Sequence, residues 1–69
     1  MTIVLQTEFQ VGDIVSLKVD PDGEKFMILG FETIYITKEG VVEDYNLVTS
    51  NRFATRVVIC PIECEKVFV

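Results

Sequence analysis

The hydrophobic pattern of this chain consists of short apolar runs separated by turn residues. The runs are rich in β-branched residues and occupy positions 14–19, 25–31, 33–37, 42–49 and 54–60. No run continues the i, i+3, i+4, i+7 spacing of an amphipathic helix over ten positions, whereas short β-branched runs between turns are typical of strands. The pattern therefore predicts an all-β protein.

The first predicted strand, 14–19, begins directly after a Gly-Asp turn at Gly12. Side chains alternate between the two faces of a strand, so apolar residues at every second position are expected to share one face. On this pattern the core side holds Val15, Leu17 and Val19, and the water side holds Ser16 and Lys18.

Further turn residues divide the rest of the chain. Asp20-Pro21-Asp22-Gly23 predicts a turn between two antiparallel strands, because Pro fixes φ early in a turn and Gly tolerates a left-handed conformation near its end. The run 25–31 is apolar on both faces, as in a central strand or a strand covered by another subunit, and Gly30 marks a candidate bulge. Residues 38–40 predict a hairpin connection, and 50–52 form a polar break before the last long run.

The end of the chain is predicted to turn once before it closes. Pro61 ends the run 54–60, because proline withholds a donor from the strand ladder. Residues 62–65 allow one helical turn, and 66–69 form a short final segment. Five or six short antiparallel strands fit a small closed or nearly closed barrel, since a β-sandwich commonly needs about 100 residues. We therefore expect one barrel domain over 1–69.

Residues 1–8 precede the Gly-Asp turn and form a candidate extra strand. The candidate strand consists of Thr2, Ile3, Val4 and Leu5. A short strand outside a barrel pairs either with an edge of its own sheet or with a neighbouring subunit. The sequence leaves these two alternatives open.

Three stretches resemble small SH3-like barrel proteins. They are Phe9-x-Val-Gly-Asp-Ile-Val-Ser-Leu17, Glu24-Lys-Phe-Met-Ile-Leu-Gly30 and Cys60-Pro-Ile-Glu-Cys-Glu-Lys-Val67. Together they are similar to the YodC-like family of uncharacterised bacterial proteins, and the Gly-Asp entry turn is shared with KOW-like and Tudor-like barrels. The resemblance implies an SH3-like barrel fold and implies no particular activity.

Composition adds an expectation about assembly. Hydrophobic residues make up 49% of the 69-residue chain, and the mean hydropathy is +0.39. A barrel of this size encloses only part of that apolar surface, and a contiguous apolar surface is usually covered by a partner. We therefore expect a homo-oligomer or a subunit of a larger assembly; a monomer with scattered exposed aliphatic residues is the alternative.

Charge and targeting signals narrow the choice of partners. Eleven acidic and six basic residues give a net charge of −5, which repels nucleic-acid phosphates and anionic membrane surfaces. The chain has no apolar stretch long enough to span a membrane, and its first eight residues lack the features of a signal peptide. We expect a cytoplasmic protein, or a virion component if the gene belongs to a phage.

Few residues are suited to catalysis or metal binding. The chain has no His, so Ser-His, Cys-His and His-metal sites are excluded within one subunit. Cys60 and Cys64 supply two thiols, whereas a structural zinc site normally needs four N or S ligands. Buried inert cysteines and a site shared across a dimer are the two interpretations. The sequence thus predicts a protein that is not an enzyme and holds no cofactor or metal.

Aromatic and cationic residues outside the expected core form the candidate interaction surface, which comprises Tyr35, Tyr45, Arg52, Phe53 and Arg56. Aromatic rings next to arginines bind peptides, methylated lysines or bases in other barrels. Two functions follow: a protein-interaction or structural assembly module, or a nucleic-acid-associated barrel of the KOW or Tudor kind. The acidic net charge favours the first.

Overall fold

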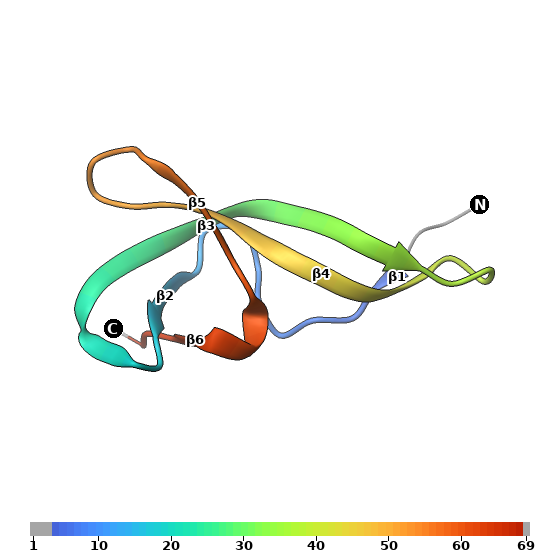
Figure 1. The fold of residues 1–69 in the computed structure, drawn as a ribbon, viewed down its shortest axis with the longest axis horizontal. Helices are drawn as coiled ribbons and strands as arrows, with labels where there is room; N and C mark the ends of the chain where they lie inside the picture. Colours follow the sequence, from blue (N-terminus) through green and yellow to red (C-terminus); the bar gives the residue numbers. More distant parts are fainter. Residues whose placement is uncertain (1–3, 69) are drawn as a thin grey trace.

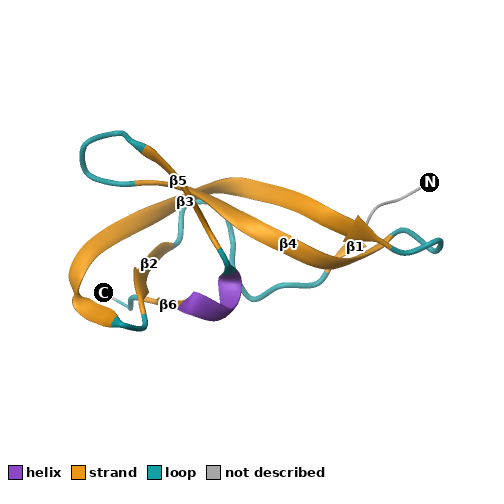
Figure 2. Cartoon of the chain, in the orientation of Figure 1, coloured by secondary structure: helices purple, strands orange, loops and turns teal. Residues whose placement is uncertain are grey.

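The computed structural model describes residues 4–68 and consists of one curled sheet with a single helical turn (Figure 1). Figure 2 shows the helical turn between the last two strands. The elements in chain order are β1 (Val4–Leu5), β2 (Ile14–Leu17), β3 (Asp20–Ile36), β4 (Val41–Ser50), β5 (Arg56–Ile59), the 3-10 turn η1 (Pro61–Glu63) and β6 (Cys64–Lys66).

The strand order confirms the predicted fold class, a small SH3-like all-β barrel with one helical turn near the C-terminus. Strands β6, β2, β3, β4 and β5 pair in that order, each antiparallel to the next. The last strand lies beside β2, the first strand of the barrel, so the sheet curls back toward its start. Two details differ from the prediction: β1 pairs with β4 in parallel, and β3 is a long strand.

The predicted runs 25–31 and 33–37 are joined in β3, which has 17 residues. With β4 it forms a hairpin that extends beyond the barrel, and the molecule measures 39 × 20 × 19 Å (Figure 1). We call the projecting part, residues 31–45, the arm. The predicted hairpin connection at its tip is confirmed: Gly40 has φ +86°, which favours glycine, and its N–H donates to the Thr37 carbonyl at 3.0 Å.

The chain reverses earlier than predicted between β2 and β3. The turn lies at Lys18–Val19, and Leu17 already pairs with Asp20. The Lys18 N–H donates to the Glu63 carbonyl at 2.9 Å, which holds the turn against η1. The next pair in the ladder is Ser16 with Lys25, so 21–24 bulge out of β3 instead of forming the hairpin turn.

The barrel core confirms part of the predicted alternation in β2. Val15 is fully buried and Leu17 is half-buried, but Val19 is 91% exposed because it lies in the turn. Ser16 is buried, contrary to the prediction, since β3 and β6 flank it on both sides of β2. The core side chains around Val15 are Phe9, Phe26, Ile28, Leu47, Ile59 and Cys64.

Two further predictions from glycine are confirmed. Gly12 has φ +96°, and the Asp13 N–H donates to the Gln10 carbonyl at 3.0 Å in a tight turn before β2. At Gly30 the register of β3 against β4 shifts by one residue, because Ile28 pairs with Thr49 and Gly30 pairs with Val48. The extra residue, Leu29, makes the bulge at which the sheet bends.

The N-terminal segment closes one side of the barrel. Val4 and Leu5 pair with β4 of the same chain, whereas Thr2 and Ile3 lie outside the described residues. Phe9 is buried in the core, and its N–H donates to Thr7 Oγ1 at 3.1 Å.

Asp13 links the entry turn to the last strand. Its Oδ2 accepts the Gln10 N–H at 2.9 Å and lies 3.3 Å from the Lys66 ammonium, the one ion pair between described residues. The Gln10 N–H and, less strongly, Lys66 lower the pKa of the Asp13 carboxyl from its ordinary value of 3.8, against a smaller opposing effect of desolvation.

The lowered pKa of Asp13 predicts a specific loss of stability in acid. A carboxyl whose folded pKa lies below its unfolded pKa stabilises the protein above the unfolded value, and this contribution is lost as pH falls through the folded value. We expect the free energy of unfolding to fall less for Asp13→Asn than for the parent chain between about pH 4 and pH 2. Urea unfolding at several pH values measures this difference, and parallel curves for the two chains would contradict it.

Candidate interaction surface

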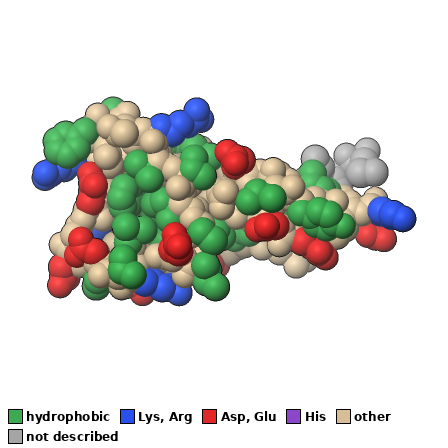
Figure 3. Space-filling view, in the orientation of Figure 1, with side chains coloured by type: hydrophobic (Ala, Val, Ile, Leu, Met, Phe, Trp, Pro, Cys, Tyr) green, Lys and Arg blue, Asp and Glu red, His purple; other side chains and the backbone are tan. Residues whose placement is uncertain are grey.

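The strands β3, β4 and β5 carry an apolar patch on the face turned away from the core. Met27, Leu29 and Val58 are 44%, 46% and 48% exposed, and Val48 is half-buried between strands. We call these four residues the outer patch. Hydrophobic side chains gather over the barrel end in the space-filling view, and others lie on the arm beside acidic side chains (Figure 3).

The register of the sheet places these side chains next to one another. Val48 pairs with Val58 on one side and with Gly30 on the other. Directly paired residues point to the same face of a sheet, and their neighbours in sequence point to the opposite face. Leu47 is fully buried in the core, so Val48 must face outward. Because Gly30 has no side chain, Leu29 in the bulge covers the space beside Val48.

Charged residues of opposite sign lie at the two ends of the outer patch. Arg56 pairs with Ser50, one outward-facing row from Val58, and its side chain is exposed. Toward the arm, the next outward rows hold Glu32, which pairs with Asn46, and Asp44, which pairs with Tyr35. Both carboxylates are exposed. The outer face therefore runs from a cationic end through an apolar centre to an acidic end.

The arm adds exposed apolar residues beyond the acidic end. Ile34 and Tyr35 are 54% and 56% exposed, and Ile36 is 39% exposed. From Leu29 to Ile36, no described strand pairs with β3 on the side away from β4. Bulges at two points in this part of the hairpin make it less regular, which is a common protection of a free strand edge.

The two predicted tyrosines lie on opposite faces of the arm. Tyr35 points outward with Asp44, whereas Tyr45 is half-buried with its ring edge against Phe31, at 5.9 Å between ring centroids. The Tyr45 hydroxyl donates to Thr7 Oγ1 at 2.7 Å. Tyr45 therefore holds the N-terminal segment, and the structure places it away from the exposed surface on which the sequence had grouped it with Tyr35.

Arg52 and Phe53 lie together in the loop between β4 and β5. The Arg52 guanidinium carbon lies 4.6 Å from the centre of the Phe53 ring, within the range of a cation–π contact. Asn51 shapes the loop, because its Oδ1 accepts the N–H groups of Phe53 and Thr55 at 2.9 and 3.0 Å. Phe53 is 68% exposed, so this stack lies on the surface and not in the core.

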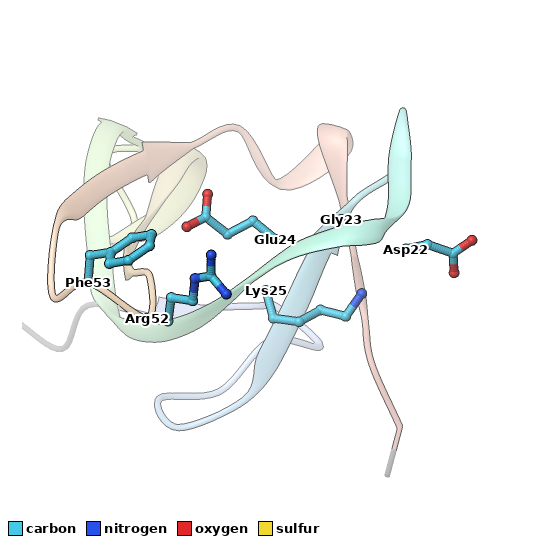
Figure 4. A pocket seen from close by; sticks show the side chains of 6 residues that line it. All are labelled: Asp22, Gly23, Glu24, Lys25, Arg52 and Phe53. Carbon is cyan, nitrogen blue, oxygen red and sulfur yellow. The ribbon is translucent and has the colours of Figure 1, made fainter.

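This loop and the bulge of β3 enclose a cleft of about 640 Å³. Its lining consists of Asp22, Gly23, Glu24, Lys25, Arg52 and Phe53. In Figure 4 the Glu24 carboxylate points into the space beside Arg52 and Phe53, whereas Asp22 points away. A carboxylate beside the arginine opposes phosphate binding, so the cleft gives little support to a nucleic-acid site. Arg56 does not line the cleft.

The five predicted surface residues are thus divided among three places, and the outer patch is a site that sequence reasoning did not name. Tyr35 and Tyr45 lie on opposite faces of the arm, Arg52 and Phe53 in the loop, and Arg56 on the outer face. The signal for the patch was present in the run 25–31, which is apolar on both faces, and in the bulge predicted at Gly30. The pairing of β5 with β4 was not visible in the sequence.

The cysteines lie on either side of η1. Cys60 is exposed, whereas Cys64 is 3% exposed and both are free thiols. Burial raises the pKa of the Cys64 thiol, and proximity to Cys60 adds to this effect. Within residues 4–68 no cluster of three metal-ligating side chains is found, and no described helix is long and apolar enough to cross a membrane.

Comparisons of the chain with models of known families, with curated proteins and with solved structures give no match. The resemblance to YodC-like proteins therefore stays a prediction.

Proposed function

We propose that this protein is a non-catalytic interaction module that acts in assembly and binds a protein partner through the outer face of β3, β4 and β5. The outer patch is the observation that carries the proposal. Three of its side chains are close to half exposed, and Val48 lies between those on β3 and the one on β5. Complete burial of a Val, Leu or Met side chain stabilises a complex by about 1.5–3 kcal/mol, so a partner over this patch gains substantial free energy.

The other exposed apolar residues give less support for a binding site. Val11, Val19, Ile62 and Phe68 are more exposed than the outer patch, but they belong to turns, to η1 or to the chain end. Single apolar residues on a surface are normal in monomeric proteins, whereas adjacent ones mark interfaces. The outer patch combines exposure with a position on three paired strands of the sheet.

The nucleic-acid function has a weaker basis. The cation–π stack of Arg52 on Phe53 favours it, but the Glu24 carboxylate points into the same cleft and the net charge is −5. We therefore propose a protein partner and keep the nucleic-acid function as the alternative.

Lysine on the outer patch is expected to abolish association without unfolding the barrel. Leu29→Lys and Val58→Lys each place a charge in the apolar centre of the proposed interface, where desolvation of the ammonium is costly. We expect each to weaken association at least about 100-fold, measured by light scattering over a concentration series. Their thermal unfolding should stay close to that of the parent, because both positions are exposed.

Val19→Lys is the matched control, since Val19 is equally aliphatic and lies 91% exposed in the turn between β2 and β3. The control should associate like the parent chain. An association that responds equally to Val19→Lys and Val58→Lys would argue against the outer face as the binding surface.

A further inference from the structure

The order of charges on the outer face suggests what covers it. Arg56 lies in the outward row next to Val58, and Glu32 lies in the corresponding row on the other side of Val48. These rows are four residues apart along β4, which is about 13 Å at ~3.3 Å per residue. The row of Val48 lies midway between them. The apolar centre is thus flanked symmetrically by opposite charges.

We infer that the partner on this face is a second copy of this chain, packed face to face about a two-fold axis that reverses the strand direction. This inference rests on the proposed function and adds to it the identity and orientation of the partner. The axis crosses the outer patch near Val48, so the apolar centre of one copy covers that of the other. The same rotation brings the cationic end at Arg56 over the acidic end at Glu32 and Asp44 of the other copy.

Electrostatics selects this orientation over its alternative. If the two copies packed with their strands in the same direction, the row that holds Arg56 would face the same row of the other copy, and the acidic rows of the two copies would face one another. Like charges that face each other across an interface are destabilising, and complementary charges fix the orientation of a complex. An isologous contact about a two-fold axis also closes on itself, and so it yields a dimer and no filament.

The arm and the β4–β5 loop fit the same arrangement. Ile34 and Tyr35 lie two and three residues further along β3 than Glu32, and Tyr35 pairs with Asp44. Arg52 and Phe53 follow Ser50 and so lie beyond the cationic end. Reversing the strand direction therefore carries the exposed apolar residues of one arm toward the exposed Phe53 of the other copy. Surface residues that are far apart within one chain become parts of one interface.

The test is sedimentation velocity on the full chain from about 1 µM to about 1 mM, with charge reversals at the two ends of the patch. Arg56→Glu and Glu32→Lys are each expected to raise the dimer dissociation constant about 10-fold or more, because each places like charges together twice in a two-fold dimer. The combination of both reversals should return the dissociation constant to within about threefold of the parent value.

Recovery in the doubly reversed chain identifies a contact between copies. The rows of Arg56 and Glu32 lie four positions apart along β4, about 13 Å, and the two residues stand on opposite sides of that strand, so their side chains do not meet within one chain. Lys18→Glu is the matched control, because it makes the same change of charge in the turn between β2 and β3. It should leave the dissociation constant close to the parent value.

Three other results would overturn the inference, and they show whether the proposed function fails with it. A dimer that is lost in Val58→Lys but unchanged by the charge reversals would overturn this orientation, while the outer face would remain the binding surface. A dimer that is unaffected by every one of these substitutions would overturn both. A chain that stays monomeric at about 1 mM would overturn the second copy as the partner, and photo-cross-linking from position 58 in the producing cells would then decide whether the face binds another protein.

Discussion

Leu47→Ala is expected to lower the free energy of unfolding by about 3 kcal/mol, whereas Val48→Ala, one residue further along β4, should lower it by less than about 1 kcal/mol. Leu47 is fully buried and pairs with Phe31 and Ile59, both of which face the same side of the sheet. The core cluster is small in number of residues, and removing the Leu47 side chain leaves a cavity at its centre. Val48 points to the outer face, where water already reaches it in the isolated chain.

The size of this effect matters because the domain is small. The free energy of unfolding of a single domain is typically about 5–15 kcal/mol, and a length of 69 residues places this chain at the low end of that range. Urea unfolding, monitored by far-ultraviolet circular dichroism, gives the loss in free energy of unfolding for each variant. Measurements at two protein concentrations show whether association contributes to the stability. Equal losses for Leu47→Ala and Val48→Ala would mean that β4 is in a different register from the one described.

The sequence predicted the barrel because its local signals agreed with one another. Apolar runs, Gly12 and the hairpin before Val41 each identified a strand or a turn that the structure confirms. These local signals are reliable because they depend on the backbone alone. A positive φ and a short hairpin connection require particular residues, whatever the tertiary structure around them.

The sequence failed where tertiary contacts decide. The Asp20-Pro21-Asp22-Gly23 signal is strong, yet the chain turns three residues earlier, where the Lys18 N–H bonds to Glu63. Ser16 is polar, yet two neighbouring strands bury it. Glu63 is 45 positions from Lys18, and Glu65, which pairs with Ser16 in β6, is 49 positions from it, so no local pattern reports either contact.

Neither the residues nor the position of the outer patch was predicted from the sequence. The surplus of apolar residues led us to expect exposed apolar surface, and the structure places part of it on the outer face of β3, β4 and β5. The residues chosen for it were aromatic or cationic, as in many interfaces, whereas the outer patch is aliphatic. The position of the outer patch depends on the pairing of β5 with β4, which places Val58 beside Val48. The whole fold determines this pairing.

The N-terminal segment also contributes to the shape of the proposed interface, because it holds the arm from the inner side. Thr7 Oγ1 accepts hydrogen bonds from the Phe9 N–H and the Tyr45 hydroxyl, which joins the segment to β4. Phe9 is 6% exposed and anchors the segment in the core. Loss of this anchor should free the segment and remove the support behind the arm.

Phe9→Ala is therefore expected to lower the free energy of unfolding by about 3–4 kcal/mol, while Val11→Ala changes it by less than about 0.5 kcal/mol. Val11 is the matched control, since it lies two residues away in the same segment and is 64% exposed. Hydrogen exchange read at individual amides distinguishes a local from a global effect. We expect protection at Val41 and Val42, opposite β1, to fall further than protection in β2. A uniform loss of protection would contradict this link, because it would show that Phe9 stabilises the barrel as a whole and does not support the arm in particular.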